Sequence, residues 1–362
     1  MCARRVPLDE LTAEDLARWD ALAVAAVEPN PFFEAAFTLP AAEHLSEPDV
    51  SMLVVEDDEG WRACLPVQRT RIARFVPGLR TWRHMYCFLG TPLLDPGQVD
   101  EAAHMLLALA LETEGQLALE ALGEGGCASV ALRRGAEELG LATLDRTTHE
   151  RALLERRPGG DYLAQMRSHR RRELNRLGRR LESELGGDLA VSDCTTEGSA
   201  LDRFLELEHS GWKGRGETAL ESSPQHAQLF RTVCRSFAAS GRLQLLALTV
   251  GDRTVAMKCN LYAGEGGFCF KIAYDEALGR FSPGVQLERE NIRRFHEDRD
   301  ERWQDSCADP QNEMINRLWP DRRRISTTVL ARRGPRAIVS RQGIRAAHAL
   351  RARDRSRASQ RS

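Results

Sequence analysis

The residues best placed to do chemistry lie between positions 268 and 295, where a strand, a polar loop and a helix start follow one another. Residues 268–274 are rich in aromatic and β-branched types and alternate apolar side chains, which predicts a strand. Ser282 and Pro283 predict a helix start. A serine hydroxyl accepts a backbone N–H at the N-cap, and a proline loses no hydrogen bond at the first helical position.

The start of this helix is a candidate anion site. We expect free backbone N–H groups at Gly284, Val285 and Gln286, supported by the positive end of the helix dipole. Gly284 also gives a ligand room to approach the backbone. Phosphate is the typical ligand of such a site, although a capped helix that binds nothing would show the same residues.

A second candidate surface is the strongly basic segment 161–185. On a helix, its apolar residues from Leu163 to Leu181 form one stripe, and Arg170 lies in the middle of that stripe. A buried guanidinium needs an anionic partner, so we expect Arg170 to face an acidic side chain or a crevice between domains. The other arginines form either a solvated face or a surface for phosphates or RNA.

Composition narrows the class of protein. A chain of 362 residues with 42% hydrophobic content predicts two domains with real cores, and a net charge of −2 gives no general case for nucleic acid or membrane binding. Nine cysteines without a Cys-x-x-Cys spacing argue against a zinc cluster or redox pair, so no metal is expected. Without a signal-peptide core or a membrane-length apolar run, we expect a reduced, soluble, cytoplasmic protein.

The elements that position these residues are read from periodicity and turn signals. In the first half the predicted helices are 8–30, 99–112 and 128–139, and the predicted strands are 51–56, 61–71, one within 81–94, 117–122 and 143–154. In the second half the predicted helices are 161–185, one from residue 199, 225–239, one from residue 283 and 309–319. Its predicted strands are 189–192, 243–250, 254–262, 268–274, 303–308 and 325–331. The fold class is therefore mixed α/β.

The middle strand of the second half has two different faces. Val255, Met257, Cys259 and Leu261 alternate on one face, which leaves Lys258, Asn260 and Tyr262 on the other. Only three of the 51 basic residues are lysines, namely Lys213, Lys258 and Lys271. We interpret this skew toward arginine mainly as an effect of genome composition.

This order of strands and helices resembles the GNAT acyltransferase superfamily, and residues 160–300 resemble its CelD-like branch of acetyltransferases associated with cellulose and exopolysaccharide biosynthesis. The resemblance rests on RSHRRRELNRLGRRLE, FLELEHSGWKGRG, GRLQLLALTVGDRTVAMKCNLY and, above all, YDEALGRFSPGVQL. It implies tandem GNAT-like folds, with a degenerate domain at 1–155, an acyltransferase domain at 156–333 and a basic tail at 334–362. The superfamily signature Gln/Arg-x-x-Gly-x-Gly/Ala is absent, as in the branch, which leaves the donor open between acetyl-CoA and another acyl-CoA.

The resemblance also implies roles for individual residues. The acyl-CoA would lie between strands 268–274 and 303–308, at residues Ile272, Arg280, Phe281, Ser282, Gly284, Val285 and Gln286. Candidate general bases are Glu208, His209 and Asp305, and Tyr274 is a candidate proton donor to the leaving thiolate. Candidate substrate-binding residues are Arg170, Trp212, Lys213 and Lys271. Each of these residues also has a purely structural alternative. Glu208 and His209 would be exposed helix positions, Asp305 would pair with an arginine, and Tyr274 would lie in the core.

Two other functions stay open. Tandem GNAT folds also occur in Fem-type transferases, which move aminoacyl groups from tRNA, so the arginine-rich helix would then meet tRNA. The third possible function is nucleic-acid binding by a protein with an inactive GNAT fold. It is suggested by the basic residues 332–362, which hold ten arginines and one acid, Asp354. We expect this tail to be disordered, because it has few large apolar residues. The leading expectation is a small-molecule or saccharide acceptor.

Overall fold

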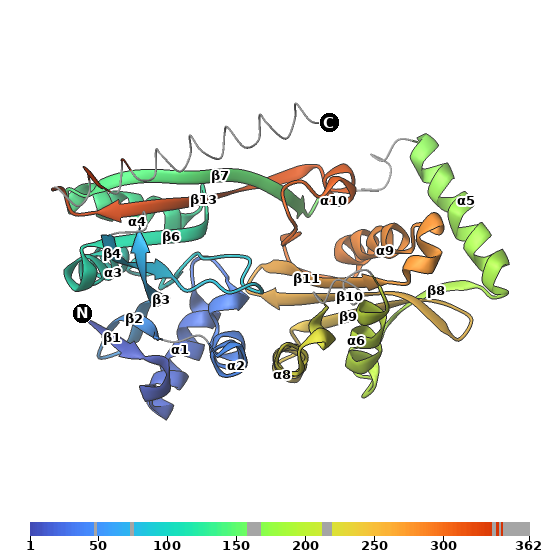
Figure 1. Ribbon diagram of the computed structural model, residues 1–362, viewed down its shortest axis with the longest axis horizontal. Helices are drawn as coiled ribbons and strands as arrows, with labels where there is room; N and C mark the ends of the chain where they lie inside the picture. Colours follow the sequence, from blue (N-terminus) through green and yellow to red (C-terminus); the bar gives the residue numbers. More distant parts are fainter. Residues whose placement is uncertain are drawn as a thin grey trace. The chain divides into compact units, whose positions relative to one another are not determined.

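The computed structural model describes residues 1–46, 49–72, 76–157, 168–211 and 219–334, together with residues 338, 339 and 342. Within these ranges the chain forms two compact units (Figure 1). Unit 1 comprises residues 1–38, 47–150 and 323–362, and unit 2 comprises residues 39–46 and 151–322. The last strand of the chain therefore belongs mostly to the first unit.

The first copy of the fold contains seven strands and four helices among the described residues. Its strands are β1 (Cys2–Pro7), β2 (Val50–Asp57), β3 (Gly60–Ile72), β4 (Val76–Thr81), β5 (Leu93–Leu94), β6 (Gln116–Gly123) and β7 (Ala142–Glu155). Its helices are α1 (Ala13–Ala25), α2 (Ala35–Leu45), α3 (Val99–Glu114) and α4 (Cys127–Glu138). The predicted hairpin at 51–71 is confirmed, with β2 antiparallel to β3.

The second copy repeats this order. Its strands are β8 (Leu189–Asp193), β9 (Leu243–Val250), β10 (Arg253–Ala263), β11 (Gly266–Tyr274), β12 (Trp303–Asp305) and β13 (Asp321–Ala331). Its helices are α5 (Ser168–Leu185), α6 (Ala200–Ser210), α8 (Pro224–Ala239), α9 (Pro283–Glu297) and α10 (Glu313–Leu318). Apart from β5 and α5, both copies run strand, two helices, three strands, helix, strand, helix, strand.

The two copies share their sheet topology as well as their element order. In each, the third strand of the central group pairs in parallel with the strand that follows the next helix: β4 with β6, and β11 with β12. The last strands are exchanged between copies. β13 pairs with β6 in unit 1, whereas residues 153–155 of β7 pair with β12 in unit 2. Element order alone could not reveal this exchange.

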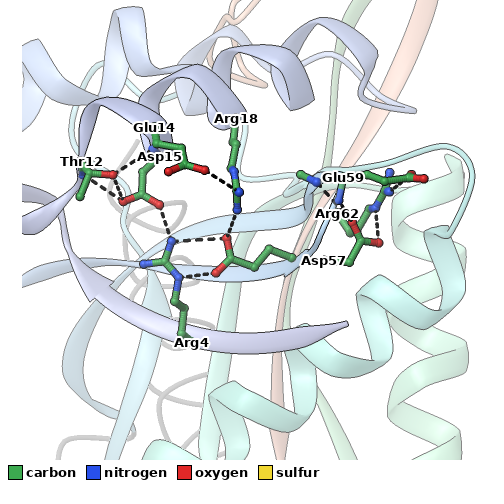
Figure 2. Close-up of polar contacts among 10 residues, drawn as sticks. Arg4, Thr12, Glu14, Asp15, Arg18, Asp57, Glu59 and Arg62 are labelled. Carbon is green, nitrogen blue, oxygen red and sulfur yellow. Dashed lines mark hydrogen bonds and ion pairs between the residues drawn. The ribbon is translucent and has the colours of Figure 1, made fainter.

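The N-terminal strand β1 was not predicted, because residues 2–7 hold two adjacent arginines and a proline and show no alternation of apolar side chains. It pairs antiparallel with β2, and ion pairs add to this contact. Arg4 donates to Glu56 at 2.6 Å and also to Asp15 in the first turn of α1, and Arg18 pairs with Glu14 at 2.6 Å (Figure 2). Thr12 and Asp15 form a reciprocal capping box. The predicted helix at 8–30 is therefore shorter, at 13–25.

Unit 2 places the candidate site on one sheet. The strand order runs from the end of β7 through β12, β11, β10 and β9 to β8. Figure 1 shows α9 on one side of this sheet and α6 and α8 on the other, in agreement with their packing against β9, β10 and β11. Both faces of β10 are buried from Val255 onward. The apolar face predicted for this strand is therefore matched by a second, covered face that holds Lys258, Asn260 and Tyr262.

Candidate functional site

The central feature of unit 2 is a pair of parallel strands that separate. β11 pairs with β12 only at Gly266–Phe268 and Trp303–Asp305, whereas β11 continues to Tyr274. The predicted strand at 303–308 is therefore wrong beyond Asp305. Beyond the paired residues, a cavity of about 210 Å³ opens between β11 and the chain that follows β12. Its lining comprises Lys258, Cys269, Phe270, Lys271, Ile272, Glu288, Ser306, Cys307, Ala308, Asn312, Met314 and Ile315. We call this space the large cavity.

Asp305 causes the early end of β12. One of its carboxylate oxygens accepts the backbone N–H of Cys307 at 2.9 Å, and Cys307 has a left-handed backbone with φ 50°. The other oxygen accepts a hydrogen bond from Arg151 at 2.6 Å, and both side chains are almost fully buried. An arginine partner for Asp305 was one of the two expected outcomes. The carboxylate holds the turn that forms one wall of the large cavity.

A β-bulge shapes the opposite wall. In the pairing of β10 with β11, Asn260 lies opposite Cys269 and Cys259 lies opposite Lys271, so Phe270 is an extra residue on β11. Bulges bend a strand and leave backbone groups outside the ladder. Because β12 has already ended, this part of β11 has no strand on that side among the described residues. Its backbone groups can therefore hydrogen-bond an extended ligand in the large cavity.

The start of α9 lies where the sequence predicts it, but its capping geometry differs. Ser282 adopts a left-handed backbone with φ 53°, and its side chain makes no cap hydrogen bond. Its carbonyl oxygen instead accepts the N–H groups of Val285 at 3.0 Å and Gln286 at 3.1 Å. The expectation of three free N–H groups is therefore wrong. Of the three, only the Gly284 N–H has no acceptor among the described residues.

Gly284 is buried against the end of β11. A Cβ atom added there would meet Tyr274 at 3.5 Å and Ile272 at 3.9 Å, which are ordinary contacts. The predicted donor-binding residues Ile272 and Gly284 are thus neighbours, although they are twelve positions apart in sequence. Tyr274 is 37% exposed, so the alternative of a core tyrosine is wrong.

Helix α5 packs against the start of α9. Gln286 donates its side-chain amide to the Leu174 carbonyl at 2.7 Å, and Arg280 pairs with Glu184 at 2.5 Å. The Phe281 ring is buried and lies against the guanidinium groups of Arg280 and Arg180. The predicted amphipathic helix is confirmed over 168–185, whereas residues 161–167 and the Arg170 side chain lie outside the described residues.

A second, small cavity of about 30 Å³ lies at the other end of β11. Its lining comprises Leu207, Glu208, Gly211, Ile272, Ala273, Tyr274 and Glu276. Ile272 lines both this cavity and the large one. Glu208 is only 4% exposed and accepts the backbone N–H of Leu220 at 2.9 Å, so it is no exposed helix position. His209, next to it on α6, is exposed.

The other substrate-binding candidates are Lys271, Trp212 and Lys213. Lys271, on β11, lines the large cavity. It also lies near His226, whose pKa is lowered by burial and by the charge of Lys271. Trp212 and Lys213 lie outside the described residues.

Sequence reasoning missed a buried polar network beneath the large cavity. Lys258 donates to Glu288 at 2.7 Å, and Asn291 donates to Glu288 and to Gln304 at 3.0 Å each. Asn260 donates to Asn291 at 2.8 Å. The remaining members are Gln244, Tyr262 and Trp319. The alternating polar residues of β10 were the available signal, but the partners on α9 lie about 30 residues away.

Two titratable groups of this region have shifted pKa values. Burial opposes the charge on Lys258, but Cys269 and Glu288 more than offset that effect and hold the Lys258 pKa above its ordinary value. Burial raises the pKa of the Cys269 thiol to about 12. At neutral pH the lysine is therefore charged and the thiol protonated, so Cys269 is not a reactive thiolate.

In the described part of the chain, no helix has the length and apolar character needed to cross a membrane. No three His, Cys, Asp or Glu side chains in the same ranges are grouped as metal ligands would be.

Comparisons with known proteins agree with this geometry. Residues 168–308 match the family model described as an acetyltransferase (GNAT) domain. The structure is similar to that of FemX (TM-score 0.60, 9% identity, 90% of this chain and 96% of that chain). It is also similar to a conserved protein of unknown function from Bacteroides thetaiotaomicron (TM-score 0.56, 10% identity, 91% and 100%). A third similar structure is the C-terminal domain of a putative lysylphosphatidylglycerol synthetase from Agrobacterium fabrum (TM-score 0.52, 12% identity, 88% and 91%). No curated protein matches the sequence.

At these identities the structural similarities concern the fold alone. The predicted fold class is confirmed, with a mixed α/β architecture, mostly antiparallel strand pairing and flanking helices. The match to the GNAT domain model covers residues 168–308, which include β8–β12 and the start of α9.

Proposed function

We propose that this protein transfers an acetyl or other acyl group from acyl-CoA to an amine or hydroxyl acceptor. The observation that carries the proposal is the separation of β11 from β12, with a cavity between them and the start of α9 beside it. A thioester donor needs an extended slot with backbone hydrogen-bonding groups on one side and a phosphate site at one end. In unit 2 the free edge of β11, the cavity beside it and the start of α9 would provide these features.

The donor is placed with its pantetheine arm in the large cavity and its pyrophosphate at the start of α9. The Gly284 N–H and the positive end of the α9 dipole would hold the phosphates. Ile272 would contact the arm, because it lies beside Gly284 and lines the cavity. Ser282, Val285 and Gln286 would act by shaping the helix start, since the Ser282 carbonyl accepts both following N–H groups.

The reacting amine or hydroxyl of the acceptor would enter the small cavity. A thioester beside Ile272 would face Glu208 across that cavity, so Glu208 is the general base that the geometry favours. Base catalysis contributes about 10²–10⁴-fold, and most of the remaining acceleration would come from holding donor and acceptor together. Tyr274 also lines the small cavity and would protonate the leaving thiolate. Asp305 would position the cavity wall.

The finer assignment rests on sequence motifs. The segment from Tyr274 to Leu287, with Tyr-Asp, a short polar loop and Ser-Pro-Gly, supports the CelD-like branch and a role in polysaccharide or cell-envelope metabolism. The alternative is a Fem-type transferase, which has a similar fold but takes its aminoacyl group from tRNA. The identity of the donor distinguishes the two functions, and thioester-dependent thiol release without tRNA would support acyl-CoA as the donor.

Replacing Gly284 with aspartate should weaken acetyl-CoA binding about 100-fold or more. The added carboxylate would stand at the start of α9, where it repels a pyrophosphate at a distance of about 5 Å with several kcal/mol. Isothermal titration calorimetry with acetyl-CoA measures the effect.

Two variants serve as controls for this experiment. Gly284→Ala adds only a Cβ with ordinary contacts, so its affinity should stay within about threefold of wild type. Gly279→Asp adds the same charge at a nearby position where a Cβ would meet nothing within 4 Å, and it should also bind normally. Unchanged binding by Gly284→Asp would remove the start of α9 from the donor site.

A further inference from the structure

A buried lysine forms part of the wall of the large cavity, and the proposed mechanism gives it no task. Lys258 is 3% exposed and its partner Glu288 is 1% exposed, yet both line the cavity. Burying an ion pair gains little stability compared with apolar residues of the same size. The pair therefore invites a functional explanation.

Glu288 is fully engaged in holding the lysine in position. One of its oxygens accepts from Lys258 at 2.7 Å, and the other accepts from Asn291 and from the Trp319 indole N–H at 3.0 Å each. These donors fix the orientation of the carboxylate. The lysine ammonium is consequently held at one place in the wall of the cavity.

The ammonium has at least one hydrogen-bond donor left for a ligand. A lysine carries three N–H donors. Among the described residues it donates to the Glu288 carboxylate at 2.7 Å, and the Cys269 sulfur is close enough to affect its pKa. The ammonium belongs to a residue that borders the open space of the large cavity.

The charge of Lys258 is already balanced. Glu288 pairs with it at 2.7 Å, so the ligand need not bring a charge of its own. A neutral carbonyl oxygen can accept the hydrogen bond and satisfy the donor. In the donor proposed above, the groups of this kind are the amides and the thioester of the arm.

The position along the strand agrees with this assignment. Lys258 lies directly opposite Ile272 in the pairing of β10 with β11, and opposite residues place their side chains on the same face. Ile272 is the residue shared by the two cavities. A carbonyl bound by Lys258 would thus lie close to the point where donor and acceptor meet.

We infer that Lys258, held by Glu288, donates a hydrogen bond to a carbonyl oxygen of the donor's thioester-bearing arm. This inference rests on the proposed function and adds a specific donor-binding residue to it. The hydrogen bond would set how deeply the arm enters the large cavity.

The test is the double variant Lys258→Met/Glu288→Gln, studied by calorimetry. The double change removes both charges, so no uncompensated charge stays buried, and the introduced glutamine keeps an oxygen for the Trp319 indole. We expect acetyl-CoA to bind about 10- to 100-fold more weakly, as for loss of a hydrogen bond from a charged donor. Binding of 3′-phospho-ADP, which lacks the arm, should stay within about twofold of wild type.

Free CoA identifies which carbonyl is bound. An equal loss for CoA and acetyl-CoA assigns an amide of the pantetheine arm, and a loss for acetyl-CoA alone assigns the thioester; either supports the inference. Lys258→Gln/Glu288→Gln also removes both charges but keeps a donor at position 258, so it should lose less affinity and serves if the first double variant does not fold. Wild-type affinity of a folded variant for all three ligands would overturn this inference alone. No binding of CoA compounds by the wild type would overturn the proposed function as well.

Discussion

Replacing Glu208 with glutamine should lower kcat for acyl transfer by about 10²–10⁴-fold, the range typical of a lost general base. Glutamine has the same shape and keeps an oxygen for the Leu220 N–H, so the fold and donor binding should stay unchanged. The assay is thiol release from acetyl-CoA with the best acceptor from a panel of sugar amines, sugar hydroxyls, amino acids and peptides.

The neighbouring histidine offers a matched control. His209 follows Glu208 on α6 but is exposed, and it does not line the small cavity. His209→Gln should therefore leave kcat within about twofold of wild type. If the histidine variant loses activity and the glutamate variant does not, the acceptor is activated from a different place and the role given to Glu208 is wrong.

Replacing Asp305 with asparagine should destabilise the protein by about 3–5 kcal/mol. The change removes the negative charge that Arg151 faces at 2.6 Å, and both side chains are almost fully buried. Asparagine still offers an oxygen to the Cys307 N–H, so the turn after β12 is not the main loss. Urea unfolding followed by circular dichroism measures the free energy of unfolding.

A second variant tests whether charge is the cause. The double variant Arg151→Met/Asp305→Asn removes both charges and should recover most of the lost free energy of unfolding. A loss below about 1 kcal/mol for Asp305→Asn alone would show that the pair is well solvated. Such a result would also free Asp305 for a role as general base.

The local elements of unit 2 could be predicted because each carries its own signal. The turn at Gly251 and Asp252 separates two apolar strands, and Ser223 and Pro224 start α8 as expected for an N-cap and first position. Strand β1 was missed because it lacks an alternating apolar pattern and is held by long-range contacts, namely its pairing with β2 and the ion pairs of Arg4 with Asp15 and Glu56.

The features of the site that could not be predicted depend on tertiary structure. At the end of β12, Asp305 pairs with Arg151, which lies over 150 positions earlier in the sequence. The left-handed backbone at Ser282 could not be predicted either, because a Ser-Pro-Gly motif normally indicates a hydroxyl cap. The partner of Lys258 could not be predicted for the same reason, because Glu288 lies on α9, 30 positions later in the sequence. Spacing located the site, and long-range contacts determine its chemistry.

The most direct test of the account is calorimetric titration of the wild-type protein with acetyl-CoA. The large cavity and the start of α9 predict saturable binding of one equivalent, with a dissociation constant of about 1–100 µM, the lower part of the range common for enzyme substrates. Absence of binding to acetyl-CoA, to longer acyl-CoAs and to free CoA would contradict the proposal that unit 2 uses an acyl-CoA donor.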